Sequence, residues 1–174
     1  AMIKSSSFFL KGLFFFSILF AAITFVFAED DDIYKKCESK YFVIYYKPDI
    51  DSLDIAQKID FGPSLHLLKN PARSDKNPEA ILSKAIDSLF LEVSDILDIH
   101  IYSFKGNIKV CRDLNSLNRI FEGLYNKTIS APSFYISDTN TIYISLADLR
   151  AGILGHEMAH AIIKLSQVTG HSKI

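Results

Sequence analysis

The sequence predicts a small α+β domain, because it combines one long helical pattern with several short strand-like runs. Apolar residues recur at helical spacing over Pro78–Asp98, which predicts a helix that packs on a sheet or on another helix. Tyr41–Tyr46 is rich in β-branched and aromatic residues and predicts a buried strand. Ser133–Ser137 and Thr141–Ser145 flank a turn at Asp138–Asn140 and predict a hairpin, which argues against an all-parallel sheet. Helices and strands therefore alternate unevenly, as they do in α+β domains.

The composition suits one folded domain and gives no support for a nucleic acid partner. A chain of 174 residues is long enough for a single globular domain with a real core. Hydrophobic residues make up 49% of the chain and charged residues 22%, which fits a folded protein rather than a disordered one. The formal net charge is −1, so we expect no nucleic acid partner and no attraction to an anionic membrane surface.

Residues 1–28 have the pattern of a secretory signal peptide. Two lysines precede the uncharged apolar run Gly12–Ala28, and the acidic residues Glu29–Asp32 follow it. The pattern favours an exported protein, periplasmic or secreted. The apolar run is near the lower length limit of a membrane span, so an uncleaved anchor is the alternative, and only then would the chain associate with a membrane. We expect a charged lead over 29–40, acting as a solvated linker, and then a domain over 41–174.

The segment between the first strand and the long helix is predicted to be mostly loop. Asp51 and Ser52 are suited to open a short helix that runs through Lys58. Phe61–Asn77 contains glycine, proline and a polar run, which predicts a loop. Asn77 is a good N-cap for the long helix, because its side chain can accept from a free backbone N–H of the first turn.

After the long helix, the sequence predicts two strand-like runs and a short helix. Ile99–Phe104 and Asn107–Cys111 flank a turn at Lys105–Asn107. Asp113 can then cap a short helix whose apolar positions extend to Leu124. These elements lead into the predicted hairpin.

Cys37 and Cys111 follow the predicted signal peptide. Export makes a disulfide between them chemically possible, and the sequence leaves the bridge open. Their spacing is that of neither a zinc clip nor a C-x-x-C redox pair.

The residues with the clearest chemistry form the sequence His156-Glu157-Met-Ala-His160, an H-E-x-x-H motif in an apolar run. On a helix, residues four apart lie on one face, so His156 and His160 can both bind one Zn²⁺. Glu157 is placed to act as general base on a zinc-activated water. Ser145 and Asp148 have the S-x-x-D pattern of a helix start, so we expect this helix to begin directly after the last strand.

This motif, after the predicted strands, long helix and hairpin, resembles the zincin metallopeptidases, and among them the small gluzincin-type domains called peptidase MA-like. The resemblance covers most of residues 41–165, and the H-E-x-x-H motif is its specific part. It implies a zinc-dependent hydrolase in which His156 and His160 bind Zn²⁺ and Glu157 is the catalytic base. It also implies that a peptide or protein substrate adds as an extended strand along Thr141–Ser145, expected to be the sheet edge.

The sequence leaves the third zinc ligand open. A gluzincin takes this ligand from a Glu on a later helix, and residues 161–174 contain no Asp or Glu. Ile163 and Ser166 stand where a metzincin has Gly and His, which excludes that subgroup. His171 is a weak candidate, similar in context to the third ligand of SprT-like zincins. The other alternative is a Glu further along a longer chain, in which case the domain is truncated at its C-terminus.

The missing third ligand also supports an alternative function. A non-catalytic zincin-like module would bind a peptide or partner protein at the cell envelope, with a weakened metal site or none. We expect His66 and His100, in a polar loop and in a strand-like run, to be structural or solvated rather than ligands.

Overall fold

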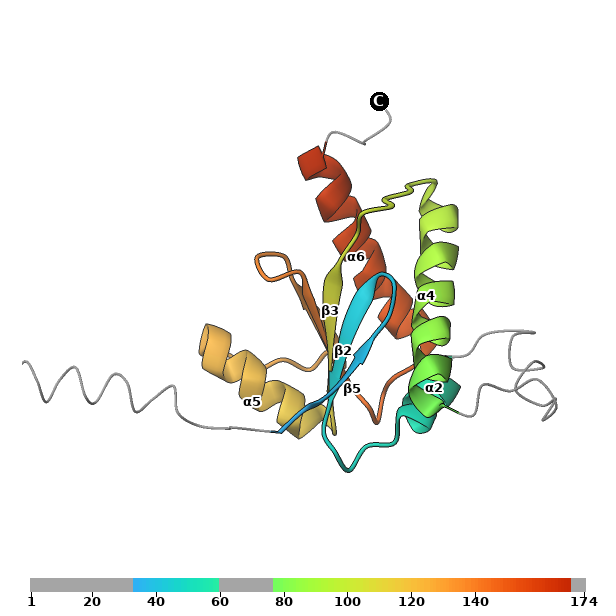
Figure 1. Cartoon of the computed structure of the whole chain (residues 1–174). Helices are drawn as coiled ribbons and strands as arrows, with labels where there is room; N and C mark the ends of the chain where they lie inside the picture. The colour runs from blue at the N-terminus through green and yellow to red at the C-terminus, as the bar shows by residue number, and fades with distance from the viewer. Residues whose placement is uncertain (1–32, 60–76, 170–174) are drawn as a thin grey trace, which may run out of the picture. The chain divides into compact units, whose positions relative to one another are not determined.

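The computed structural model describes residues 33–59 and 77–169 of the chain (Figure 1). Contacts between residues divide the chain into Ala1–Ile33 and Tyr34–Ile174, and all the helices and strands below belong to the second unit. Within the described part, no helix combines the length and apolar character that crossing a bilayer requires.

Several predicted features lie outside the described residues. They are the signal peptide over 1–28, most of the loop over 61–77, and the side chains of His66 and His171. The fold neither confirms nor corrects these predictions.

Five strands form one mixed sheet, in the order β1-β2-β3-β5-β4. Neighbouring strands β2 and β3, and β3 and β5, are parallel, whereas β1 and β4 pair antiparallel with β2 and β5 at the two ends. The strands are β1 (Lys35–Glu38), β2 (Phe42–Tyr46), β3 (Gly106–Cys111), β4 (Ser133–Ile136) and β5 (Thr141–Ser145). The mixed sheet and the predicted hairpin of β4 and β5 confirm the α+β class.

Four helices accompany the sheet in the described residues, and two of the predicted caps are in place. They are α2 (Ser52–Ile59), α4 (Pro78–Leu97), α5 (Leu114–Tyr125) and α6 (Ala151–Thr169). Asn77 Oδ1 accepts from the Glu79 N–H at 3.0 Å at the start of α4. Asp113 Oδ1 accepts from the Ser116 N–H at 2.7 Å at the start of α5. Each cap satisfies a backbone donor that has no partner inside the helix.

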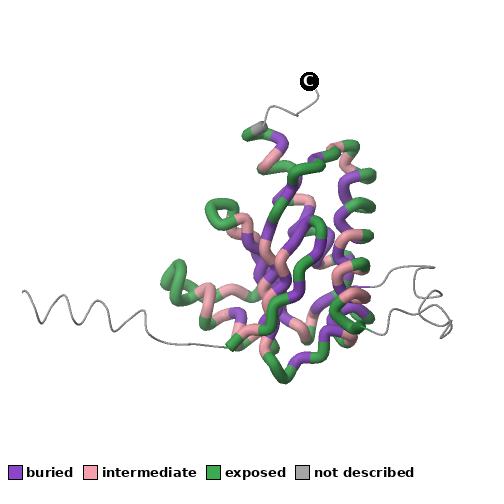
Figure 2. The backbone as a smooth tube through the Cα atoms, viewed as in Figure 1, coloured by how far each residue is buried: buried purple, intermediate pink, exposed green. Residues whose placement is uncertain are grey.

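The helices lie on both faces of the sheet (Figure 1). The inward apolar stripes of α2, α4 and α6 pack on one face and form the larger core with Ile44, Ile108 and Ile142. On the opposite face α5 packs over β3, β4 and β5, and Leu117 and Phe134 belong to this smaller cluster. Figure 2 shows the buried backbone running through the sheet and along the inner sides of the helices. The larger core therefore holds α6 against the sheet.

Two sequence predictions about strands are wrong. Lys35–Glu38, predicted as part of a solvated lead, is an edge strand in which Cys37 is buried and its neighbours are exposed. Edge strands tolerate charged side chains, because only one of their faces needs to be apolar. Ile99–Phe104, predicted as a strand, is an irregular connection in which Ile101 and Phe104 are buried, so its apolar residues anchor a loop.

Cys37 and Cys111 form no disulfide. Both are free and buried, and they belong to the core clusters on opposite faces of the sheet. Burial raises the pKa of each thiol to about 11, because a buried thiolate loses its hydration. At neutral pH both side chains are therefore uncharged core residues.

Candidate functional site

Helix α6 carries the H-E-x-x-H motif, but it begins later than the sequence predicts. The chain leaves β5 and turns over Leu146–Asp148 before the helix starts at Ala151. Ser145 Oγ donates to Asp148 Oδ2 at 3.0 Å, and the Asp148 N–H donates to the Ser145 carbonyl at 3.2 Å. The S-x-x-D pattern thus closes a turn instead of capping α6, and that prediction is wrong.

The two faces of α6 have different environments. Met158, Ala161 and Ile162 are buried in the larger core, whereas His156 and His160 are exposed. Successive helical residues are about 100° apart, so side chains two positions from Met158 point roughly away from the core. The core thus fixes the rotation of α6, and this rotation presents both imidazoles to solvent.

The two histidines converge on one point. His156 Nε2 and His160 Nε2 are 3.0 Å apart, and the rings are perpendicular with centroids 4.6 Å apart. At this distance at least one Nε2 must present a lone pair to the other, because two N–H groups would collide.

The spacing of the two nitrogens fits a shared zinc ion. Zinc–nitrogen bonds of about 2.0–2.1 Å in tetrahedral geometry place two ligand nitrogens about 3.3–3.4 Å apart. The pair would need to open by only about 0.3–0.4 Å to reach this spacing, which small changes in the side-chain torsions can provide. The residues present therefore fit Zn²⁺ as two of its ligands.

Glu157 lies on the side of α6 that faces the sheet edge. The residue is 7% exposed, and its Oε1 accepts from Ser133 Oγ at 2.7 Å. Ser133 is the first residue of β4 and is also 7% exposed. The sequence analysis did not select Ser133, because a serine at a strand start has no pattern that points to a helix 24 positions away.

The predicted position of the sheet edge is wrong. β5, Thr141–Ser145, lies between β3 and β4, and all five of its residues are buried. Among the described strands, β4 (Ser133–Ile136) is the edge on the side of α6. The hairpin alone does not determine which of its strands faces inward, because that depends on pairing with β3, which is distant in the sequence.

Other candidate residues are not at this site. His100 is exposed, and its Nδ1 lies 3.7 Å from Asp95 Oδ1 at the C-terminal end of α4. In the described part of the chain, no three His, Cys, Asp or Glu side chains gather closely enough to hold a metal ion. Among the described residues, the candidate site therefore consists of the two histidines and the Glu157 carboxylate.

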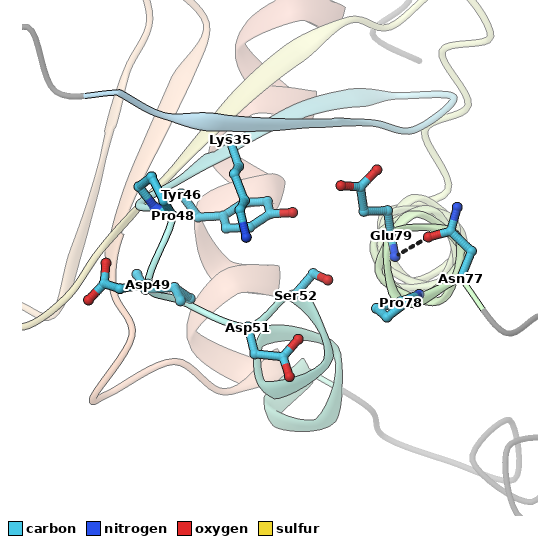
Figure 3. A pocket seen from close by; sticks show the side chains of 10 residues that line it. Lys35, Tyr46, Pro48, Asp49, Asp51, Ser52, Asn77, Pro78 and Glu79 are labelled. Carbon is cyan, nitrogen blue, oxygen red and sulfur yellow. Dashed lines mark hydrogen bonds between the residues drawn. The ribbon is translucent and has the colours of Figure 1, made fainter.

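A separate cavity of about 380 Å³ lies where the N-terminal ends of α2 and α4 approach β1 and β2 (Figure 3). Its lining includes Lys35, Tyr46 and three acidic side chains, and none of the motif residues. Several of its polar groups already have partners: Asp49 pairs with Arg112, and Asp51 Oδ1 accepts from the Leu53 N–H at 2.9 Å. We assign no function to this cavity.

Comparisons with models of protein families, with curated proteins and with solved structures found no match to this chain. The assignment of function therefore depends on the motif and on the geometry around it.

Proposed function

We propose that this chain is an exported zinc-dependent metallopeptidase domain of the zincin type. The main support is the arrangement on α6, where His156 Nε2 and His160 Nε2 converge at 3.0 Å and Glu157 directly follows His156 in the motif. The mixed sheet, with an antiparallel strand at the edge next to this helix, is compatible with the zincin resemblance. Export is proposed from the signal-peptide pattern of residues 1–28.

Each motif residue has a distinct role in the proposed reaction. Zn²⁺ held by His156 and His160 would supply a Lewis acid that polarises a carbonyl group and lowers the pKa of water. Glu157 takes a proton from the attacking water at a carboxylate oxygen and returns it to the leaving amine nitrogen. The exposed position of the histidine pair leaves it accessible to a substrate from solvent.

The proposed substrate is an extended peptide that adds to β4 rather than to β5. β5 has both neighbours already, so its backbone hydrogen-bonding groups are used within the sheet. An edge strand offers one row of backbone N–H and C=O groups to an added strand. A peptide along β4 would pass close to α6, because Ser133 of this strand contacts Glu157.

The proposed zinc site requires a third ligand, and the described residues do not supply one. His171 is a weak candidate and lies outside them. The other source is a Glu in a continuation of the chain. Metal-bound structures of a longer version of the chain would identify the ligand directly.

The test of the enzyme proposal is Glu157→Ala, measured against a mixed peptide library in the presence of zinc. Loss of the general base should reduce kcat by about 100- to 10,000-fold, while zinc binding is retained. Glu122→Ala is the matched control, because Glu122 is exposed on α5, outside the proposed site. A zinc-loaded Glu157→Ala protein with full activity would overturn the proposed mechanism.

The second candidate is a non-catalytic zincin-like module that binds peptides or a partner protein at the cell envelope. It is favoured by one observation: the described residues bring no third ligand to the histidine pair. This candidate predicts a folded protein that contains less than stoichiometric zinc and binds extended peptides without cleaving them. Metal analysis of the purified chain, combined with the cleavage assay, separates the two functions.

A further inference from the structure

The bond between Ser133 and Glu157 joins the edge strand to the motif helix. Ser133 Oγ donates to Glu157 Oε1 at 2.7 Å, and both residues are 7% exposed. Because both residues are largely shielded from water, this hydrogen bond is stronger than it would be in solution. Water also cannot easily replace the Ser133 hydroxyl as the donor to Glu157.

The register of the hairpin places the Ser133 side chain on the face of the sheet that α6 covers. Ser133 is paired with Ile144, which is buried in the larger core under α6. Phe134, the next residue, points to the opposite face and packs in the α5 cluster. Because side chains alternate along a strand, a shift of one residue in the register would remove the hydroxyl from Glu157.

The hydrogen bond restricts the orientation of the carboxylate. The terminal torsion of a Glu side chain has a broad energy minimum, so an unanchored carboxylate samples many orientations. With Oε1 held by Ser133, the carboxylate has fewer orientations in which to meet the attacking water. The anchored carboxylate is also fixed relative to β4, along which the proposed substrate lies.

We infer that Ser133 is a positioning residue for Glu157, which orients the general base and registers it with the substrate strand. This inference deepens the proposed peptidase function and depends on it for its kinetic test. Ser133 acts through Glu157 and takes no proton from the substrate or from water.

The kinetic test compares Ser133→Ala, Ser133→Thr and Ser145→Ala in the zinc-loaded full chain. Loss of the hydroxyl in Ser133→Ala should lower kcat by about 10- to 100-fold, the usual range for a group that orients a ligand or base, with KM and zinc affinity unchanged. Ser133→Thr keeps a hydroxyl, so its kcat should stay within about threefold of the native value. This loss is much smaller than the loss expected in Ser133→Ala.

Ser145→Ala is the matched control. Ser145 is also a buried serine that donates to a carboxylate, Asp148 Oδ2, but it does not contact Glu157. Its loss should reduce stability while kcat stays within about twofold of native, because only the Ser133 bond orients the base. Equal losses of kcat in Ser133→Ala and Ser145→Ala would mean a general structural effect and would overturn the inference.

A structural readout separates this inference from the proposed activity. Crystal structures of the zinc-loaded variants should show the Glu157 carboxylate displaced in Ser133→Ala and in its native position in Ser133→Thr. If the native chain binds zinc but cleaves no peptide, the proposed function fails, and a displaced carboxylate still supports the positioning role. An unmoved Glu157 carboxylate in Ser133→Ala overturns the positioning role.

If Ser133→Ala does not fold, the test uses Ser133→Thr instead. A retained hydrogen bond to Glu157 together with native kcat supports the positioning role. A retained hydrogen bond with lost kcat overturns it.

Discussion

The histidine pair and Glu157 lie within one and a half turns of the same helix, yet their positions have different causes. His156 and His160 are exposed, and their spacing of four residues puts them on one face of the helix, where their Nε2 atoms lie 3.0 Å apart. Glu157 is buried, and its carboxylate is held by Ser133 on a strand that is distant in the sequence. The histidine pair is thus a local feature, whereas the orientation of the Glu157 carboxylate depends on the sheet. Variants that affect one group and spare the other can test this difference.

The largest expected effect is on the local feature. Substitution of His156 or His160 by Ala leaves a single imidazole, so zinc affinity should fall by more than about 100-fold, the upper end of losses from outer-shell changes. Titration calorimetry measures this affinity. The matched control is His100→Ala, an exposed histidine near Asp95, which should leave zinc affinity unchanged. Equal affinity in His156→Ala and the native chain would mean that the pair does not bind the metal.

The next effect concerns the core contact that fixes the rotation of α6. Ile162 is 0% exposed, so Ile162→Ala should cost about 2–5 kcal/mol of folding free energy, through lost burial and a residual cavity. Its neighbour Ile163 is 39% exposed, and Ile163→Ala should change stability by no more than about 0.5 kcal/mol.

Urea unfolding of the metal-free proteins measures this difference, because bound zinc would add its own stabilisation. Comparable losses in the two variants would show that α6 is not held by the face described here. The histidine pair would then point elsewhere.

The distinction between local and long-range causes also explains which sequence predictions succeed. The long helix and its Asn77 cap depend on residues within a few positions of each other, and both are confirmed. The hairpin over β4 and β5 is confirmed for the same reason. The zinc site itself stays a prediction.

Predictions that required knowledge of distant partners were wrong. The zincin resemblance implied that Thr141–Ser145 is the sheet edge, but this strand lies between β3 and β4 and all of its residues are buried. Its end hydroxyls are accommodated by hydrogen bonds: Thr141 donates to the Thr139 carbonyl, and Ser145 donates to Asp148. Buried polar groups with such partners cannot be distinguished from exposed ones by composition.

Ser133 was missed for a related reason. Its role depends on the register of β4 and on the rotation of α6, and neither is set by residues near Ser133. A local motif therefore predicted the ligands and the base, whereas Ser133, the residue proposed to orient the base, emerged only from the fold.

The smallest expected effect compares two glycines of α6, one exposed and one buried against α4. Gly152 is exposed and a Cβ there meets nothing within 4 Å, so Gly152→Ala should stabilise the protein by up to about 1 kcal/mol through helix propensity. Gly155 is buried, and a Cβ there would lie 3.3 Å from Val93 Cγ2 of α4. Val93 would have to shift by a few tenths of an ångström, so Gly155→Ala should gain less than Gly152→Ala. Urea unfolding of both metal-free variants gives the order. If Gly155→Ala were the more stable, α4 and α6 would pack less closely than described, and the core would fix the direction of His156 and His160 less firmly.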